Sequence, residues 1–252
     1  MKRGYFIAAF ILAFFTFGAF GVHAAEAHTH CVCGTFSCTA DSETKHADQK
    51  INEADWQPWS GDLSVGTVTD ETTEIYLYLE NDVTIKDTLN ITNVTVHLCL
   101  NGKTLTIDKE GNPAVRVGEN QKFVLCDCKG NGKITGAKGN AGDAATLRGT
   151  VNCQAGSNFI MYGGSIADNE LTGSNGGGIY VKGYRDNTTY PYFYTNIYDC
   201  DIHNNTATGD GGGMCFDGAN WDNQFINLYD CKVRDNSSDA SGAAYLLKRM
   251  QM

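Results

Sequence analysis

The segment that decides the fold occurs three times in the chain, as FIMYGGSIADN at 159–169, TNIYDCDIHNN at 195–205 and INLYDCKVRDN at 226–236. Aligned one above another, the copies share two apolar columns and one asparagine column: Met161, Ile197 and Leu228; Ile166, Ile202 and Val233; Asn169, Asn205 and Asn236. After each copy comes a second shared element, GGGIYV at 176–181, GGGMCF at 211–216 and the less regular SGAAYL at 241–246. Such self-similarity predicts a solenoid in which each coil stacks on the one before it.

The same pattern continues upstream in a weaker form. FVLCDCKGNGKITG at 123–136 matches the repeat with three extra residues, and VHLCLNGKTLTI at 96–107 is similar to one coil earlier. Short β-branched runs at 75–79, 83–85 and 89–91 favour strands. We therefore expect an all-β solenoid over 61–252, with turns marked by Gly, Asn and Asp. We expect Trp56 and Trp59, in the lead-in to the first coil, to plug its amino-terminal end.

Composition narrows the class of protein and of partner. The chain has 252 residues, of which 42% are hydrophobic and only 19% charged, a balance that argues against disorder. The formal net charge of −10 disfavours nucleic acid, whose binding depends on Lys and Arg neutralising phosphates. An anionic membrane surface is disfavoured for the same reason.

The first 27 residues have the pattern of a secretory signal peptide. Lys2 and Arg3 give a positive start, an apolar stretch follows at 6–20, and Ala25-Glu26-Ala27 is a small-x-small cleavage site. The apolar stretch is shorter than the ~20 residues of a bilayer span. We therefore expect export to the exterior or the cell surface, and a mature chain without a membrane span.

A short Cys/His-rich segment, 28–60, follows the signal peptide. Its imidazole and thiol groups suit Zn²⁺, which prefers four N or S donors; the ligand candidates are His28, His30, Cys31 and Cys33. Their spacing lacks the usual two-residue gap, and a bridge from Cys31 or Cys33 to Cys38 is the alternative. The Gly- and Asp-rich stretch 208–218 lacks the residue order of calcium-binding nonapeptides. No cofactor is expected beyond these Zn²⁺ and Ca²⁺ candidates.

Cys200 and Cys231 occupy the same column of consecutive repeats. At the usual strand spacing of about 4.8 Å, their Cα atoms fall within the disulfide range of ~4.4–6.8 Å. A Cys200–Cys231 disulfide is therefore a candidate. A ladder of buried free thiols is the alternative, since unpaired Cys is a good apolar filler.

These segments resemble the repeats of right-handed parallel β-helix proteins of the pectin-lyase-like superfamily. The pairing of GGGI with a strand that ends in Asn is similar to the repeats of polymorphic outer-membrane adhesins. LCLNGKTLTI and LCDCKGNGKITG resemble the opening coils of large secreted or surface β-helix proteins of gut-type bacteria. The resemblance covers 75–247 and implies a right-handed parallel β-helix. It leaves function open, because this fold carries polysaccharide lyases, glycosidases, phage tailspikes and non-catalytic adhesins.

The catalytic chemistry of that superfamily needs groupings that this sequence offers only weakly. Its lyases use a basic Arg or Lys with Ca²⁺ held by carboxylates, and its hydrolases use clustered Asp pairs with a nearby His. The best match places Asp201 opposite Lys232, and His203 opposite Arg234. Ordinary cross-strand charge pairing explains the same residues. We therefore expect no catalytic site, and keep a polysaccharide lyase or glycoside hydrolase as the alternative function.

Two insertions, at 182–194 and 217–224, leave the same edge of neighbouring coils. They bring aromatic residues side by side: Tyr184, Tyr190, Tyr192 and Trp221. Rigid aromatic rings give contact area at low entropic cost, which suits a carbohydrate or a protein surface. The alternative is that some rings fold back over the flank of the solenoid.

The chain stops in the middle of a coil, at 243–252, where a solenoid needs a polar cap. This pattern indicates a truncated product, or an end covered by a second copy in end-to-end association. Three functions then follow in order of preference. The first is an adhesin-like, non-catalytic surface protein that binds glycan or protein, the second is the polysaccharide-cleaving enzyme, and the third is a structural spacer.

Overall fold

The computed structural model describes residues 56–67, 74–140, 148–183, 193–218, 224–243 and the backbone of 245–248. Apart from one short 3-10 turn, η1 (Leu63–Thr67), the described elements are all β-strands, and every strand pair among them is parallel. Among these residues no helix has the length and apolar character needed to cross a bilayer. Segments 1–27 and 28–55, with the expected signal peptide and the metal candidates His28, His30, Cys31 and Cys33, lie outside the described residues.

The strands form four parallel sheets. Sheet 1 has the order β1 (Gln57–Pro58), β2 (Glu74–Tyr78), β5 (Thr95–Cys99), β8 (Lys122–Cys126), β12 (Asn158–Tyr162), β16 (Phe193–Tyr198), β20 (Gln224–Tyr229). Sheet 2 has β3 (Val83–Ile85), β6 (Thr104–Ile107), β9 (Lys133–Thr135), β13 (Ser165–Ala167), β17 (Asp201–His203), β21 (Lys232–Arg234). Sheet 3 has β10 (Lys138–Asn140), β14 (Glu170–Thr172), β18 (Thr206–Ala207), β22 (Ser237–Ser238). Sheet 4 has β4 (Leu89–Ile91), β7 (Val115–Val117), β11 (Val151–Cys153), β15 (Ile179–Lys182), β19 (Met214–Asp217), β23 (Tyr245–Lys248).

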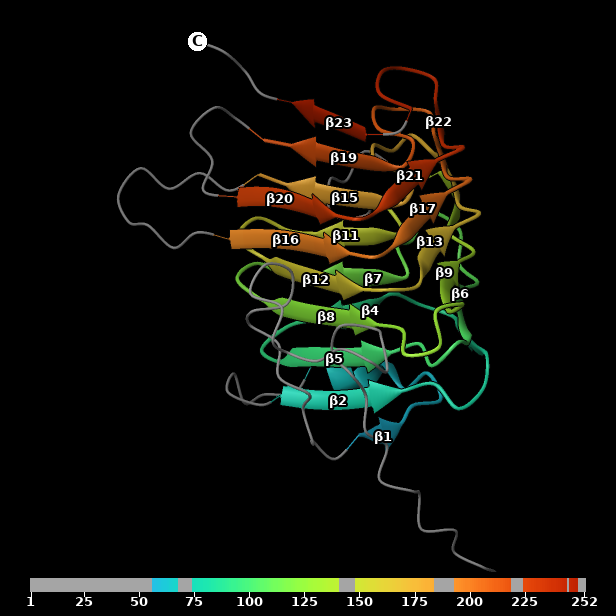
Figure 1. The fold of residues 1–252 in the computed structure, drawn as a ribbon, viewed down its shortest axis with the longest axis vertical. Coiled ribbons are helices and arrows are strands. Elements are labelled where there is room, and N and C mark those ends of the chain that lie inside the picture. The colour runs from blue at the N-terminus through green and yellow to red at the C-terminus, as the bar shows by residue number, and fades with distance from the viewer. Residues whose placement is uncertain are drawn as a thin grey trace, which may run out of the picture.

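The chain visits the sheets in turn and then starts the next coil. From β2 onward, each coil adds one strand to sheet 1 and then one to sheet 2, and the later coils add one to sheet 3 before sheet 4. Figure 1 shows the result as a stack of strands that runs from β1 at one end to β23 at the other. The predicted all-β solenoid is therefore confirmed.

The register agrees with the alignment of the repeats. Met161 is the Cα partner of both Leu125 and Ile197, and Ile202 pairs with both Ile166 and Val233. These columns point inward and form one continuous core, with residues such as Met161, Ile166 and Ile202 fully buried. Each coil thus buries its apolar side chains against the coils on either side. These contacts between neighbouring coils stabilise a solenoid.

The asparagine column forms a buried ladder of side-chain amides. Asn169 donates from Nδ2 to Asn205 Oδ1 at 2.8 Å, and Asn205 donates from Nδ2 to Asn236 Oδ1 at 3.0 Å. The residue before each asparagine, Asp168, Asn204 or Asp235, has a left-handed φ of 58°, 53° or 53°. Asn and Asp tolerate this conformation better than other non-glycine residues. The sequence pairs DN, NN and DN therefore encode the same sharp turn in three coils.

The glycine triplets are required by close backbone approach. A Cβ on Gly177 would lie 2.4 Å from the carbonyl oxygen of Gly212 and 2.7 Å from that of Thr206. Both contacts are shorter than any side chain permits, so the coils pack here through bare backbone.

Both tryptophans of the lead-in are 4% exposed, but they pack on different sides of sheet 1. Trp59 belongs to the inner core, and its Nε1 donates to the Asp62 carbonyl at 2.9 Å. Trp56 joins a second cluster on the outward side, edge-on to Tyr76 with ring centroids 5.4 Å apart. Of the two tryptophans, Trp59 therefore packs into the inner core of the first coil and Trp56 does not.

Candidate functional site

The outward face of sheet 1 carries a column of tyrosines near the carboxyl ends of its strands. Tyr162, Tyr198 and Tyr229 are consecutive Cα partners. Tyr162 and Tyr198 stack with centroids 5.1 Å apart, and Tyr198 and Tyr229 with centroids 4.6 Å apart and planes 7° apart. The 4.7–4.9 Å strand spacing of parallel coils sets this distance directly.

A second aromatic pair lies at the other end of the last two strands. Tyr194 on β16 stacks on Phe225 on β20, with centroids 5.7 Å apart. Between the two pairs, Asn227 donates from Nδ2 to Asn196 Oδ1 at 2.8 Å. We call this outward surface of β16 and β20 the aromatic face: Tyr194, Asn196, Tyr198, Phe225, Asn227 and Tyr229.

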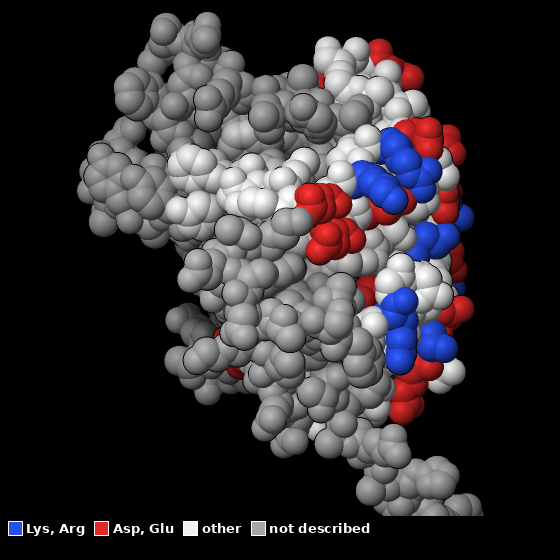
Figure 2. All heavy atoms as spheres, in the orientation of Figure 1, with Lys and Arg blue, Asp and Glu red and all other residues white. Residues whose placement is uncertain are grey.

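The aromatic face is the exposed end of a mostly buried outer surface. Tyr194, Phe225 and Tyr229 are 39%, 38% and 36% exposed, whereas Tyr162 and Tyr78, on earlier coils of the same sheet, are 3% and 5% exposed. In Figure 2 the surface over β16 and β20 is uncharged and ends in acidic side chains at the carboxyl ends of the strands. The exposed residues Asp199 and Asp230 directly follow these strands.

The aromatic residues predicted from sequence, Tyr184, Tyr190, Tyr192 and Trp221, lie outside the described residues. The strands that follow their loops, β16 and β20, are neighbours in register from Phe193 and Gln224 onward. The strands that follow the two loops therefore begin side by side in sheet 1, with Tyr194 opposite Phe225. The sequence reasoning missed the aromatic face itself. Its signal was present in the fourth position of each repeat, Tyr162, Tyr198 and Tyr229, one residue after an inward column and hence outward by the period of two.

The four weak catalytic candidates do come together on sheet 2. Asp201 is the Cα partner of Lys232 and His203 that of Arg234, as predicted. The ion pair, however, runs diagonally: Arg234 donates to Asp201 Oδ2 from Nη2 at 2.7 Å and from Nε at 3.2 Å. His203 Nδ1 lies 3.2 Å from Asp201 Oδ1 without hydrogen-bond geometry.

This cluster has the character of a charge ladder. Arg234 also donates to Asp235 Oδ2 at 2.8 Å, and the two carboxylates raise the pKa of its guanidinium. Two coils earlier, Lys133 and Asp168 form another ion pair between adjacent coils, at 2.9 Å. Figure 2 shows Lys, Arg, Asp and Glu interspersed along this flank. Asp201 Oδ2 accepts two hydrogen bonds from one guanidinium, as in a structural ion pair.

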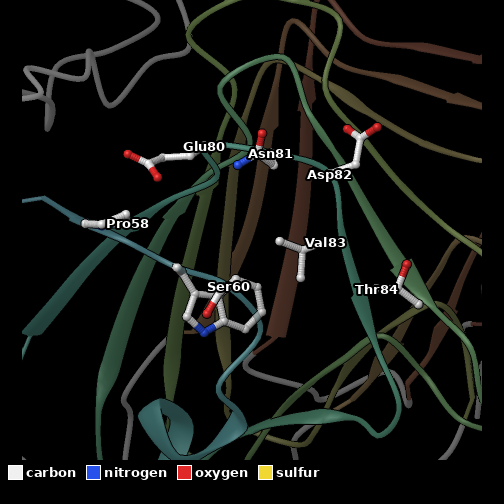
Figure 3. Close-up of a pocket in the computed structure, with 8 residues that line it drawn as sticks. Pro58, Ser60, Glu80, Asn81, Asp82, Val83 and Thr84 are labelled. Atoms are coloured by element: carbon white, nitrogen blue, oxygen red, sulfur yellow. The ribbon is translucent and has the colours of Figure 1, made fainter.

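A hollow of about 390 Å³ lies at the amino-terminal end of the solenoid, lined by Pro58, Trp59, Ser60 and residues 80–84. Figure 3 shows its two carboxylates, Glu80 and Asp82, diverging on either side of Asn81. Asp82 Oδ1 accepts from the Thr104 amide at 2.8 Å, and Glu80 accepts from the Tyr78 hydroxyl at 3.3 Å. Asp82 thus bonds the next coil and Glu80 bonds its own, and the hollow presents no converging pair of carboxylates.

The predicted metal ligands lie outside the described residues. Within the described part of the chain, no group of three or more His, Cys, Asp or Glu residues is arranged to hold a metal ion. In the Gly-rich stretch 208–218, Asp217 instead accepts from the Tyr180 hydroxyl at 3.0 Å and lies 3.3 Å from Arg148 Nη1. Burial raises the pKa of Tyr180 well above its usual range, the Asp217 carboxylate raises it further, and Arg148 opposes the shift.

The candidate disulfide residues, Cys200 and Cys231, are neighbouring free thiols in the structure. They lie on adjacent coils, between the Cα partners Tyr198–Tyr229 and Asp201–Lys232. The register thus places the two cysteines side by side on adjacent coils, and a disulfide between them stays a prediction.

Comparison with known proteins gives no relative from which a function could be transferred: no protein-family model, no curated protein and no solved structure matches this chain. A functional conclusion therefore rests on the fold and side chains described above.

Proposed function

We propose that this chain is a secreted or cell-surface protein of the right-handed parallel β-helix, pectin-lyase-like kind. In this proposal it acts as an adhesin-like, non-catalytic binding module for glycan or for a protein surface. The observation that carries the proposal is the aromatic face, where two exposed aromatic pairs flank an amide pair on the rigid strands β16 and β20.

The geometry favours a hydroxyl-rich ligand. The rings stack in pairs along the solenoid axis, so each ring of a pair covers one face of its partner and leaves its edge accessible. Asn196 and Asn227 add amide donors and acceptors between the two pairs. The ring edges supply apolar contact, and the amide groups can donate hydrogen bonds to sugar hydroxyls and accept them. The loops with Tyr184, Tyr190, Tyr192 and Trp221 would extend this surface at one edge.

The test is binding of the mature chain to an array of immobilised neutral and acidic oligosaccharides and to cells. We expect the double variant Tyr198→Ser and Tyr229→Ser to lose at least about tenfold in affinity, as for central aromatic contacts. The pair Tyr192→Ser and Trp221→Ser tests the loop contribution in the same assay. Lys232→Ala is the matched control, because it is exposed on the same coil but belongs to sheet 2. Unchanged binding in both aromatic variants would refute the proposal.

The second candidate function is cleavage of an acidic polysaccharide, for which Asp201, near His203 and paired with Arg234, is the candidate group. That function predicts product release from polyuronate with Ca²⁺, lost on Asp201→Asn or His203→Ala. The binding proposal predicts no turnover, and unchanged oligosaccharide binding in both variants. A wild-type chain that folds, binds nothing and cleaves nothing is instead a structural spacer.

A further inference from the structure

The thiols of Cys200 and Cys231 occupy the turn between sheet 1 and sheet 2 on adjacent coils. Their register is fixed on both sides, by Tyr198 opposite Tyr229 and by Asp201 opposite Lys232. The Lys232 amide donates to the Cys200 carbonyl at 2.8 Å, so the two backbones run in contact at this point. Neighbouring parallel strands hold their Cα atoms about 4.8 Å apart, within the range that a disulfide spans.

The two thiols differ in exposure. Cys200 is 2% exposed, and its Sγ lies 2.8 Å from the Tyr198 carbonyl and 3.5 Å from that of Gly163. Cys231 is half-buried, because β20 and β21 are the last strands of sheets 1 and 2 in the described structure. The other free cysteines in the described part of the chain are buried: Cys99, Cys126, Cys128, Cys153 and Cys215.

Their electrostatic environments differ in the same sense. The Cys231 sulfur lies 3.1 Å from the Ile197 carbonyl and 3.3 Å from that of Tyr229. The neighbouring Cys200 lowers the pKa of Cys231 to about 7, although burial and the Asp199 carboxylate oppose the shift. Burial raises the pKa of Cys200 well above its usual range. A half-exposed sulfur that ionises readily, next to a buried protonated one, is the arrangement found where one thiol attacks and another resolves.

We propose that Cys231 and Cys200 form a thiol–disulfide exchange site for small-molecule disulfides, in which Cys231 attacks and Cys200 resolves. The Cys231 thiolate attacks one sulfur of a disulfide RSSR, forms a mixed disulfide and releases one RS⁻, which takes up a proton. The Cys200 thiol then loses its proton and attacks Cys231 Sγ, releasing a second RSH. The net change oxidises the two cysteines to one disulfide and reduces RSSR to two RSH.

The product would bridge the two coils that carry the aromatic face. Cys200 and Cys231 lie two residues after Tyr198 and Tyr229, so the bridge would hold that tyrosine stack in register. The exchange chemistry itself does not depend on the binding proposal.

The test uses the full chain, reduced and then treated with oxidised glutathione, followed by proteolysis that separates the Cys200 and Cys231 peptides and by mass spectrometry. We expect the wild type to yield a Cys200–Cys231 bridge and two glutathione thiols released for each bridge formed. Cys200→Ser should instead accumulate a stable glutathionyl group on Cys231. Cys231→Ser should leave Cys200 reduced.

Cys153→Ser, at a buried thiol of sheet 4, is the control and should behave as the wild type. Circular dichroism establishes that each variant is folded, and Cys200→Ala replaces Cys200→Ser if the hydroxyl destabilises the buried site. A wild type whose Cys231 stays reduced, or a folded Cys200 variant in which Cys231 carries no adduct, would overturn the proposal. A Cys231→Ser variant whose Cys200 is modified at the wild-type rate would overturn the assigned order of attack.

Discussion

The side-chain amide of Asn205 donates to Oδ1 of Asn236 at 3.0 Å, and that same oxygen accepts from the Asn205 backbone amide at 2.9 Å. Asn205 also donates to the Ile166 carbonyl at 2.9 Å, and it is fully buried. One side chain thus satisfies polar groups of the coils on both sides of it.

Replacing Asn205 by Ala should therefore destabilise the protein by about 2–4 kcal/mol, since it orphans buried polar partners on two coils. Urea unfolding measures the loss. Asn227→Ala is the control, because its Asn196 partner is only half-buried, and it should cost less than about 1 kcal/mol. Equal costs for the two variants would mean that the ladder is not a principal source of stability.

A methyl group at Gly177 should be far more damaging than one at Gly130. The Gly177 Cβ would lie 2.4 Å from the Gly212 carbonyl oxygen, whereas a Cβ at Gly130 meets nothing within 4 Å. We expect Gly130→Ala to cost about 1–2 kcal/mol, the penalty of its left-handed φ of +83°. Gly177→Ala should cost more than about 3 kcal/mol, as for other severe packing defects. Thermal unfolding of the two variants, measured side by side, gives the loss of stability of each. A Gly177→Ala variant that loses no more stability than Gly130→Ala would show that the coils can separate here.

His97 should make stability depend on pH between about 6.5 and about 4. Desolvation, and less so Lys122, lower its pKa from 6.5 to about 4, although Glu74, 3.5 Å away, opposes the shift. Between these pH values His97 is protonated in the unfolded chain but neutral in the folded chain. The free energy of unfolding therefore falls as the pH falls, and it levels off below about pH 4.

The loss should reach about 2–3 kcal/mol, at about 1.4 kcal/mol for each pH unit. Urea unfolding from pH 7 to pH 4 measures it. His97→Phe keeps the stack on Tyr76, whose centroid lies 4.3 Å from that of His97, and should flatten the profile in this window. An unchanged slope in this variant would assign the pH dependence to other groups.

Cys231 should react with iodoacetamide at a rate that rises with pH and reaches half its plateau near pH 7. The neighbouring Cys200 lowers the pKa of Cys231 to about 7, while the Asp199 carboxylate opposes the shift, and Asp230 precedes it in the chain. Cys153, whose pKa is raised by full burial, should stay unlabelled until the protein unfolds. Peptide mapping after timed quenching gives both rates. A rate that reaches half its plateau only near pH 9 would show that the pKa of Cys231 is that of an ordinary cysteine.

Much of the architecture could be predicted from the repeats alone. Aligning Met161 with Ile197 and Ile166 with Ile202 gave the inward columns, and their register in turn gave Asp201 opposite Lys232. This succeeded because parallel stacking turns sequence period into spatial position, so that equivalent residues must be neighbours.

The detail of the sites was less accessible. The alignment pairs Asp201 with Lys232, yet the longer, planar Arg234 side chain reaches Asp201 diagonally and holds it with two donors. Which rings of the tyrosine column are exposed was equally hidden, because Tyr162 and Tyr229 occupy the same repeat position but are 3% and 36% exposed.

The sequence by itself thus determined which side chains share a column, which columns point inward, and where the tight turns fall. Those properties depend on local backbone geometry and on a constant coil spacing. Only the tertiary structure decided which outward columns are covered, which charges meet, and that Cys231 is half-exposed while Cys200 is buried. Exposure and side-chain pairing depend on where a coil lies in the stack and on how far each side chain reaches. The sequence of a single repeat contains neither piece of information.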